Sequence, residues 1–230
     1  MKIVISLGGS ILTNPLSADI ILKYAGQLNR LHQEGHGLIV VCGGGSTCKQ
    51  YQRIAEKCGA NDEILNRIGT QVTHLNAYVL IGALQNDSVQ RSPSTYEEID
   101  RHFGQKIIVT GGLSELLGPS TDYDAALYAE RYKADLFINA TDVDFVYDKN
   151  PKEFSDAKAL TKATYDELLY ILRDNPQGPM DTLLFDREAV EVLKRNSIKL
   201  IFINGNNPEN LANAIAGKSI GTVISNSKDL

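Results

Sequence analysis

The 230-residue sequence is poor in the residues that build disulfide frameworks and metal clusters. Its three cysteines, Cys42, Cys48 and Cys58, are too few and too odd in number for a disulfide framework, and their spacing differs from that of a zinc site. We therefore expect reduced thiols, as in a cytoplasmic protein. The four histidines do not cluster, so a histidine-based metal site or catalytic triad has little support, and we assign no metal-ligating residue.

The sequence also lacks a basic excess and a long apolar segment. Its 23 Lys and Arg residues are outnumbered by 28 Asp and Glu residues, which gives a formal net charge of −5. Because nucleic-acid-binding proteins usually carry a basic face, we expect no nucleic-acid partner. No window reaches the length of a membrane span, and Lys2 is followed by a strand pattern instead of a signal peptide. We expect a cytoplasmic location without membrane contact.

Hydrophobic residues are plentiful, at 43% of the chain, and they fall into alternating strand-like and helix-like segments. Apolar runs predict strands at 2–7, 37–42, 105–110, 134–140, 198–204 and 221–224. Amphipathic stretches predict helices at 17–34, 46–58, 61–85, 122–133, 164–174, 186–196 and 208–216. The alternation indicates an α/β fold, a three-layer αβα sandwich with a mainly parallel sheet. Since no linker is long enough to separate domains, we expect a single domain over 1–230, with two lobes sharing one sheet.

Three of the predicted strands end in glycines. The glycine turns are Gly8-Gly9-Ser10, Gly43-Gly44-Gly45-Ser46 and Gly111-Gly112. Glycine lets the backbone approach a ligand with no Cβ in the way, and N–H groups at the start of the next helix favour an anion. Each turn alone is a weak signal, because none matches the Walker or the dinucleotide-binding pattern. Together they favour a site for several phosphates, as in phosphoryl transfer.

Polar residues close to these turns are candidates for chemistry. Lys49 follows Gly45 by four residues and could offset phosphate charge, although a solvated lysine on a helix face is an equal alternative. Ser120, Thr121 and Asp122 open a predicted helix. Their side chains either cap that helix, or contact a phosphate with the Asp organising Mg²⁺ or a nearby lysine.

A second polar group follows the predicted strand at 134–140. Asp142 and Asp144 alternate along an extended segment, so they share a face. Tyr147 either stacks on a base or packs against the protein. By itself this segment is only suggestive of a nucleotide site.

The order of these motifs along nearly the whole chain resembles the amino-acid kinase family, specifically its uridylate (UMP) kinase branch, and is closest to the archaeal type. The matching segments are Leu7-Gly8-Gly9-Ser10, Gly43-Gly44-Gly45-Ser46-Thr47, Gly69 with Leu75-Asn76-Ala77, Gly111-Gly112, Ser120-Thr121-Asp122, Thr141-Asp142-Val143-Asp144, Val146-Tyr147 and Asn150-Pro151-Lys152. This order is far more specific than any one motif. The resemblance implies the amino-acid kinase fold and a phosphotransferase.

The resemblance also implies roles for individual residues. The lobe at about 1–133 would bind the acceptor and the lobe at about 134–230 would bind ATP. The implied catalytic residues are Gly9, Gly45, Lys49 and Asp122. The implied ATP contacts are Gly8, Gly9, Ser10, Gly45, Lys49, Thr141, Asp142, Tyr147 and Asn150. The implied acceptor contacts are Gly44, Asn66, Ser114, Gly118, Ser120 and Thr121.

The reaction implied by the resemblance is phosphorylation of a nucleoside monophosphate by ATP and Mg²⁺, with UMP to UDP as the leading expectation. Family members serve pyrimidine biosynthesis in the cytoplasm and are commonly homo-oligomers, often hexamers. Two alternatives stay open. One is a kinase for another phosphorylated acceptor such as isopentenyl phosphate, and the other is a non-catalytic nucleotide-binding or storage homologue.

Several positions depart from the family pattern. The departures are Ser6 for a frequent Lys, Lys49 for Arg, Asn66 for Asp, His74 for Arg, Phe145 for Gly and Asn150 for Asp. Replacing Arg by Lys removes a bidentate grip on phosphate. Phe145 cannot easily adopt a positive φ, so we expect that the local backbone differs there or that the ring occupies space near the adenine. Several of these changes fall in the implied acceptor site, and the acceptor is therefore less well defined than the reaction.

Overall fold

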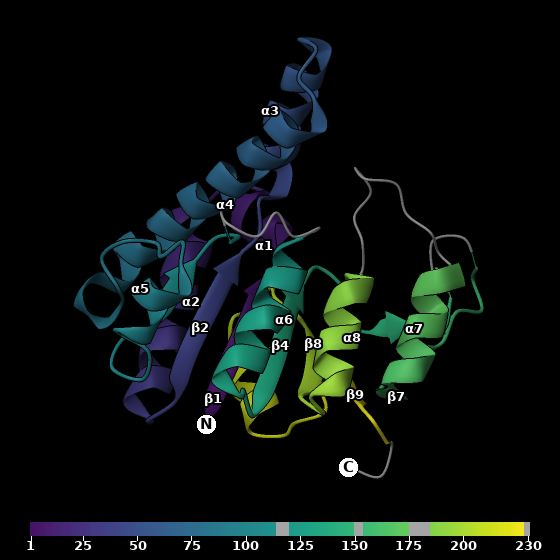
Figure 1. The fold of residues 1–230 in the computed structure, drawn as a ribbon. Coiled ribbons are helices and arrows are strands. Elements are labelled where there is room, and N and C mark those ends of the chain that lie inside the picture. Colours follow the sequence, from purple (N-terminus) through teal and green to yellow (C-terminus); the bar gives the residue numbers. More distant parts are fainter. Residues whose placement is uncertain (114–119, 150–153, 175–184, 228–230) are drawn as a thin grey trace.

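The computed structural model describes residues 1–113, 120–149, 154–174 and 185–227, and these form a seven-stranded sheet between layers of helices (Figure 1). The strands lie in the order β3-β2-β1-β4-β8-β9-β7. Their bounds are β1 Lys2–Leu7, β2 Gly37–Cys42, β3 Ile108–Thr110, β4 Leu136–Thr141, β7 Lys162–Thr164, β8 Lys199–Asn204 and β9 Gly221–Ser225. Two further strands, β5 (Val146–Tyr147) and β6 (Ala159–Leu160), pair with each other.

Five neighbouring strands, from β3 to β8, run parallel, whereas β9 is antiparallel to β8 and pairs in parallel with the edge strand β7. The central strand β1 pairs with β2 on one side and β4 on the other. Its residues Ile3, Val4 and Ile5 are fully buried, because continuous apolar runs suit strands covered on both faces. The prediction of a mainly parallel three-layer α/β fold is confirmed.

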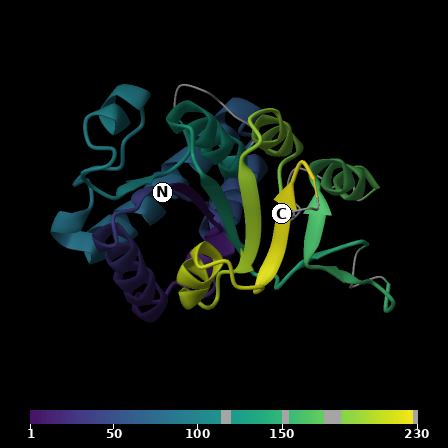
Figure 2. The ribbon, with the colours of Figure 1, turned by 90° about the horizontal axis from the view of Figure 1, so that it is seen from below.

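Helices cover both faces of the sheet (Figure 2). One face carries α2 (Ala18–Gln33) and α9 (Glu209–Ile215), and the other carries α6 (Thr121–Tyr132), α8 (Arg187–Arg195) and α7 (Tyr165–Asp174). The long helix α4 (Asp62–Leu84) packs against α2 and against β2 and β3. None of the described helices is long and apolar enough to cross a membrane.

Helix α3 (Gly45–Lys57) pairs with α4 and stands beyond the carboxyl ends of the parallel strands, at the top of Figure 1. All its side chains are at least partly exposed. Helix α4 begins where Asn61 accepts a hydrogen bond from the Ile64 N–H, with Asp62 and Glu63 in the first turn. Both features favour a helix start.

The structure contains short elements that the sequence patterns missed. These are α1 (Gly9–Thr13), η1 (Gln85–Asp87), α5 (Tyr96–Asp100), the β5–β6 pair and β7. The strand predicted at 105–110 is shorter, because the chain turns just before it, where Phe103 and Lys106 form an isolated bridge. One sheet spans both halves of the chain, and the division into an acceptor lobe and an ATP lobe stays a prediction.

Candidate active site

Two of the three glycine turns touch each other at the carboxyl ends of β1 and β2. The pairing of Leu7 with Cys42 brings Gly8–Gly9 beside Gly43–Gly45. A Cβ on Gly9 would lie 2.0 Å from the Gly45 nitrogen, and one on Gly43 would lie 2.5 Å from the Gly9 nitrogen. Glycine is therefore required here by the close approach of two backbones.

The starts of α1 and α3 are joined by one hydroxyl group. Thr13 Oγ1 donates a hydrogen bond to the Gly9 carbonyl at 2.8 Å and accepts one from the Ser46 N–H at 3.0 Å. Ser46 Oγ in turn donates to the Thr13 carbonyl at 3.0 Å. Gly45 adopts a φ of +61°, which glycine tolerates without strain. These bonds fix the start of α3 beside the Gly8–Gly9 turn and use the Ser46 N–H. Anion binding at a helix start depends on the remaining first-turn N–H groups.

The third glycine turn serves a different purpose from the other two. A Cβ on Gly111 would lie 2.4 Å from Thr73 Oγ1 and 2.6 Å from the His74 nitrogen, so this glycine allows the chain to pack against α4. The Gly112 N–H donates to Thr73 Oγ1 at 2.9 Å. The first two turns pack against each other, whereas this one packs against a helix, so the three turns are not equivalent.

The buried Ser6 and the half-buried Asp122 form a pair between β1 and the start of α6. Ser6 Oγ donates a hydrogen bond to Asp122 Oδ1 at 2.6 Å. Burial raises the pKa of Asp122 to about 6, the Ser6 hydrogen bond opposes this, and the charge of Asp186 adds to it. Ser6 therefore supplies Asp122 with a hydroxyl donor.

The starts of α6 and α8 are also joined. Ser120 Oγ accepts from the Tyr123 N–H at 3.2 Å, which caps α6, and donates to Asp186 Oδ2 at 2.6 Å. The other oxygen of Asp186 accepts from the Glu188 N–H at 2.8 Å and caps α8. The capping interpretation of Ser120 holds in this structure, and its contact with an acceptor stays a prediction.

Asp124, also in the first turn of α6, is a buried carboxyl group. Its Oδ2 accepts from the Leu113 N–H at 2.9 Å, while its Oδ1 is buried without a partner among the described residues. Burial is the main reason that the pKa of Asp124 rises to about 7, with the Leu113 hydrogen bond opposing it and Asp186 adding to it.

The raised pKa of Asp124 predicts a pH-dependent stability difference. Between about pH 4 and pH 7 the folded state binds more protons than the unfolded state, so this carboxyl destabilises the fold increasingly as pH rises. Asp124→Asn keeps an acceptor for the Leu113 N–H and removes the charge. We expect its melting temperature to exceed that of the wild type by about 5 °C at pH 8, with the gap closing toward pH 4. Thermal unfolding at both pH values checks this, and a gap independent of pH would contradict it.

The predicted ATP segment lies at the end of β4, next to β1. The Gly8 N–H donates to the Ala140 carbonyl at 2.9 Å, so Thr141 follows directly beside the first glycine turn. Asp142 and Asp144 are both exposed, and Asp144 Oδ1 accepts from Asn204 Nδ2 at 2.8 Å. Thr141 Oγ1 donates to Asp142 Oδ1 at 3.3 Å.

The remaining residues of the predicted ATP segment begin at Phe145. Phe145 is absent from the residues with a positive φ and is half-buried, and its expected difference from the family backbone stays a prediction. Tyr147 lies in β5, where it pairs with Ala159. The predicted contacts Asn150, Ser114 and Gly118 lie outside the described residues.

Helices α3 and α4 carry the remaining predicted residues. Lys49 is half-buried in the first part of α3, and its charge lowers the pKa of the neighbouring Cys48 thiol while burial, the larger effect, raises it. Asn66 is exposed on α4, on the same stripe as Thr70 and Thr73. Thr73 Oγ1 donates to the Thr70 carbonyl and Thr70 Oγ1 to the Asn66 carbonyl.

Sequence reasoning did not assign Thr13, Thr73 or the side chain of Asn76 to the site. Asn76 Nδ2 donates to the Gly43 carbonyl at 2.8 Å and to the Gly44 carbonyl at 3.3 Å, so it holds the second glycine turn. The signal for these residues was that Thr73 and Asn76 lie among apolar residues on the buried side of α4. Buried polar groups nearly always have hydrogen-bond partners, so each of them indicates a specific contact.

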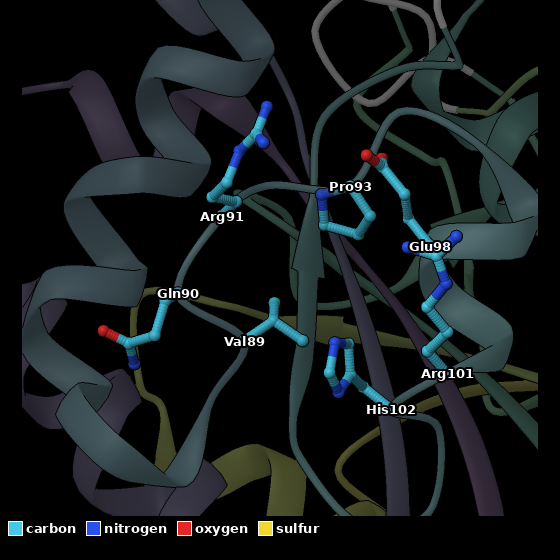
Figure 3. A pocket seen from close by; sticks show the side chains of 7 residues that line it. All are labelled: Val89, Gln90, Arg91, Pro93, Glu98, Arg101 and His102. Carbon is cyan, nitrogen blue, oxygen red and sulfur yellow. The ribbon is translucent and has the colours of Figure 1, made fainter.

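A separate cavity of about 250 Å³ lies beside α5 (Figure 3). Arg91, Arg101 and His102 line it together with Glu98, and Pro93 contributes apolar surface. It contains none of the predicted site residues. Within the described ranges, no group of three or more His, Cys, Asp or Glu residues is arranged to hold a metal ion.

Comparison with known proteins agrees with this geometry. The family model described as "Amino acid kinase family" matches residues 1–204. The uridylate kinase of Methanothermobacter thermautotrophicus is 37% identical over 225 residues, covering 97% of this chain and 99% of that protein. The crystal structure of uridylate kinase from Archaeoglobus fulgidus superposes with a TM-score of 0.86 at 34% identity, covering 98% of this chain and all of that one. The UMP kinase structure from Bacillus anthracis, at 22% identity and a TM-score of 0.83, shares the fold. The chain belongs to the amino acid kinase family.

Proposed function

We propose that the protein transfers the γ-phosphoryl group of ATP to UMP and releases ADP and UDP. The observation that carries the proposal is the contact between the Gly8–Gly9 and Gly43–Gly45 turns at the ends of adjacent parallel strands. Similarity to archaeal uridylate kinases over nearly the full chain, at 34–37% identity, supports UMP as the acceptor.

The reaction requires positioning and charge neutralisation more than covalent chemistry. An oxygen of the UMP phosphate attacks the γ-phosphorus of ATP, and the bond from that phosphorus to the oxygen bridging the β- and γ-phosphates breaks. The Gly8 and Gly43 N–H groups bond the Ala140 and Leu7 carbonyls. The other N–H groups of the two glycine turns and the Lys49 ammonium group stabilise the charge on the transferring group. The acceptor phosphate needs no strong general base, so a catalytic histidine is not required.

ATP and UMP are placed on opposite sides of β1 in this proposal. Thr141 and Asp142 follow β4 on one side and contact ATP, while Gly44 follows β2 on the other and contacts UMP. Thr121 and Asp122 are the first two residues of α6, and Asp122 bonds Ser6 near the carboxyl end of β1. Mg²⁺ supplies further charge neutralisation when it is bound to the ATP phosphates, because this ion is commonly held by substrate phosphates with one or two carboxylates.

We also propose that the protein is a homo-oligomer in the cytoplasm, a hexamer by family resemblance, and acts in pyrimidine biosynthesis. The side chains of Leu75, Tyr78 and Val79 on α4 are 57%, 45% and 41% exposed, so packing within this chain does not cover them. Apolar residues grouped on one surface are typical of association between subunits. Sedimentation velocity of the wild type measures the oligomeric state.

The acceptor assignment predicts a definite order of substrates. With ATP and Mg²⁺, UMP is expected to give more product than CMP, AMP or isopentenyl phosphate. An ADP-release assay with all four acceptors measures this order. If the rate is highest with isopentenyl phosphate, the assignment of UMP as the acceptor is wrong, while the assignment of phosphoryl transfer still holds. Binding of nucleotides without ADP release from any acceptor would instead support a non-catalytic homologue.

A further inference from the structure

Helix α4 places three polar side chains on its buried side, where they contact two glycine turns. Thr73, His74 and Asn76 are only 4%, 8% and 6% exposed. Asn76 donates to the carbonyls after β2, and Thr73 and His74 bond the chain after β3. One helix therefore sets the positions of the backbones at the ends of two adjacent strands.

The hydrogen bonds of His74 define the position of its ring proton. His74 Nε2 lies 2.9 Å from the Gly112 carbonyl oxygen, which can only accept, so Nε2 carries the hydrogen. His74 Nδ1 lies 2.6 Å from Ser92 Oγ and accepts from that hydroxyl. Burial lowers the pKa of His74, which favours this neutral ring.

The backbone around Gly112 is held from three directions. Thr73 Oγ1 accepts from the Gly112 N–H, His74 donates to the Gly112 carbonyl, and Asp124 accepts from the Leu113 N–H. The glycine at 111 allows α4 to approach this closely. Three side chains from two helices thus hold this backbone, and precise positioning of a ligand requires such support.

The strand order assigns this backbone to the acceptor side of the site. Gly112 follows β3, which lies beyond β2, whereas the ATP contacts proposed at Thr141 and Asp142 follow β4 on the opposite side of β1. Two proposed acceptor contacts lie near it. Thr121 Cγ2 would lie 3.9 Å from a Cβ on Gly112, and the Gly44 carbonyl accepts from Asn76 on the same helix.

We propose that His74 is a positioning residue for the acceptor nucleotide, acting through its hydrogen bond to the Gly112 carbonyl. This inference rests on the proposed phosphorylation of UMP. In this proposal His74 contributes to the affinity for UMP and not to that for ATP. The family pattern has arginine at this position.

Two conservative variants separate the two hydrogen bonds of His74. The amide nitrogen of His74→Gln reaches the place of Nε2 and keeps the donor to Gly112, whereas the amide of His74→Asn matches only Nδ1 and its contact with Ser92. We expect His74→Asn and His74→Ala to raise the KM for UMP about tenfold, the effect of one lost buried hydrogen bond. The KM for ATP should stay within about twofold of the wild type. His74→Gln should keep a KM for UMP close to that of the wild type.

Val72→Ala is the matched control, because Val72 is a buried neighbour on α4 without a polar side chain. It is expected to lower the melting temperature without changing the ratio of the two KM values. A second readout is independent of turnover. The ¹⁵N shifts of the His74 ring, assigned by comparison with His74→Gln, should show the hydrogen on Nε2.

The outcomes distinguish this inference from the proposed function. Equal changes in both KM values for His74→Asn, or no change in either, would overturn the positioning role, as would a hydrogen on Nδ1. If the wild type does not phosphorylate UMP, the proposed acceptor is wrong, and the variants are then measured with the acceptor that it uses best. A wild type inactive with every acceptor would overturn both proposals.

Discussion

Lys49→Ala is expected to lower turnover by about 100- to 1000-fold, because one donor to a developing phosphoryl charge contributes roughly that much. Lys49 is half-buried in the part of α3 that follows the Gly43–Gly45 turn. The loss should fall on turnover and not on stability, since the ammonium group acts on charge that develops in the transition state. Steady-state kinetics with ATP and UMP, together with a melting curve, measure both.

Lys57→Ala is the control for this variant. Lys57 is exposed in the last turn of the same helix, so its replacement removes an equal charge far from the glycine turns. It should change turnover by less than about twofold, as is usual for surface substitutions. Lys49→Arg should retain part of the activity, because the guanidinium group also neutralises phosphate charge. If Lys49→Ala and Lys57→Ala behave alike, Lys49 is a solvated surface residue.

Gly9→Ala is expected to be the more damaging change for the fold. The new Cβ would lie 2.0 Å from the Gly45 nitrogen, 2.5 Å from its Cα and 2.8 Å from the Gly43 carbonyl carbon. All three are backbone atoms, so no side-chain rotation relieves the overlap and the two turns must separate. Overpacking of this kind costs about 1–3 kcal/mol or more, equivalent to roughly 5–10 °C in melting temperature. Turnover should be abolished in the fraction that folds, because the separated turns no longer share a phosphate.

Gly26→Ala tests whether the effect of Gly9→Ala comes from the contact. Gly26 lies inside α2 with nothing within 4 Å of its added Cβ. The same substitution there should stabilise the protein by about 0.5–1 kcal/mol, because alanine is the better helix former. A Gly9→Ala protein with wild-type stability and turnover would show that the two turns are not held as closely as the structure places them.

The larger elements were predictable because their sequence patterns are long. The strands at 2–7 and 37–42 match β1 and β2, and the helix expected at 61–85 is α4 within one residue at each end. Buried strands in a parallel sheet need continuous apolar runs, and a helix of that length shows many turns of its pattern. The local sequence pattern was therefore sufficient to predict the type and position of these long elements.

The missed elements are short and depend on their surroundings. Helix α1 has five residues directly after a glycine turn, and β5, β6 and β7 have two or three residues each. Periodicity cannot be recognised over such lengths. The sequence patterns also could not predict that β9 runs antiparallel to β8, because this direction depends on where the chain returns to the sheet.

The candidate site was predictable in its residue types but not in its contacts. Gly9 and Gly45 were recognised as turn residues, yet their mutual contact depends on the pairing of two strands. The turn at Gly111 was expected to match them, and its packing against Thr73 comes from a helix distant in sequence. Glycine permits close approach of any kind, and only the fold shows whether a ligand or a helix approaches.

The central place of β1 has a consequence for how the chain acquires its structure during synthesis. β1 precedes every other strand of the sheet in the sequence, yet Leu7 pairs with both Cys42 and Ala140. At about 5–20 residues per second, one edge of this apolar strand waits on the order of ten seconds for β4 to leave the ribosome. An unpaired apolar edge is a template for wrong pairing with another chain. The strand that ends in the first glycine turn therefore stays open to wrong pairing until β4 has been synthesised.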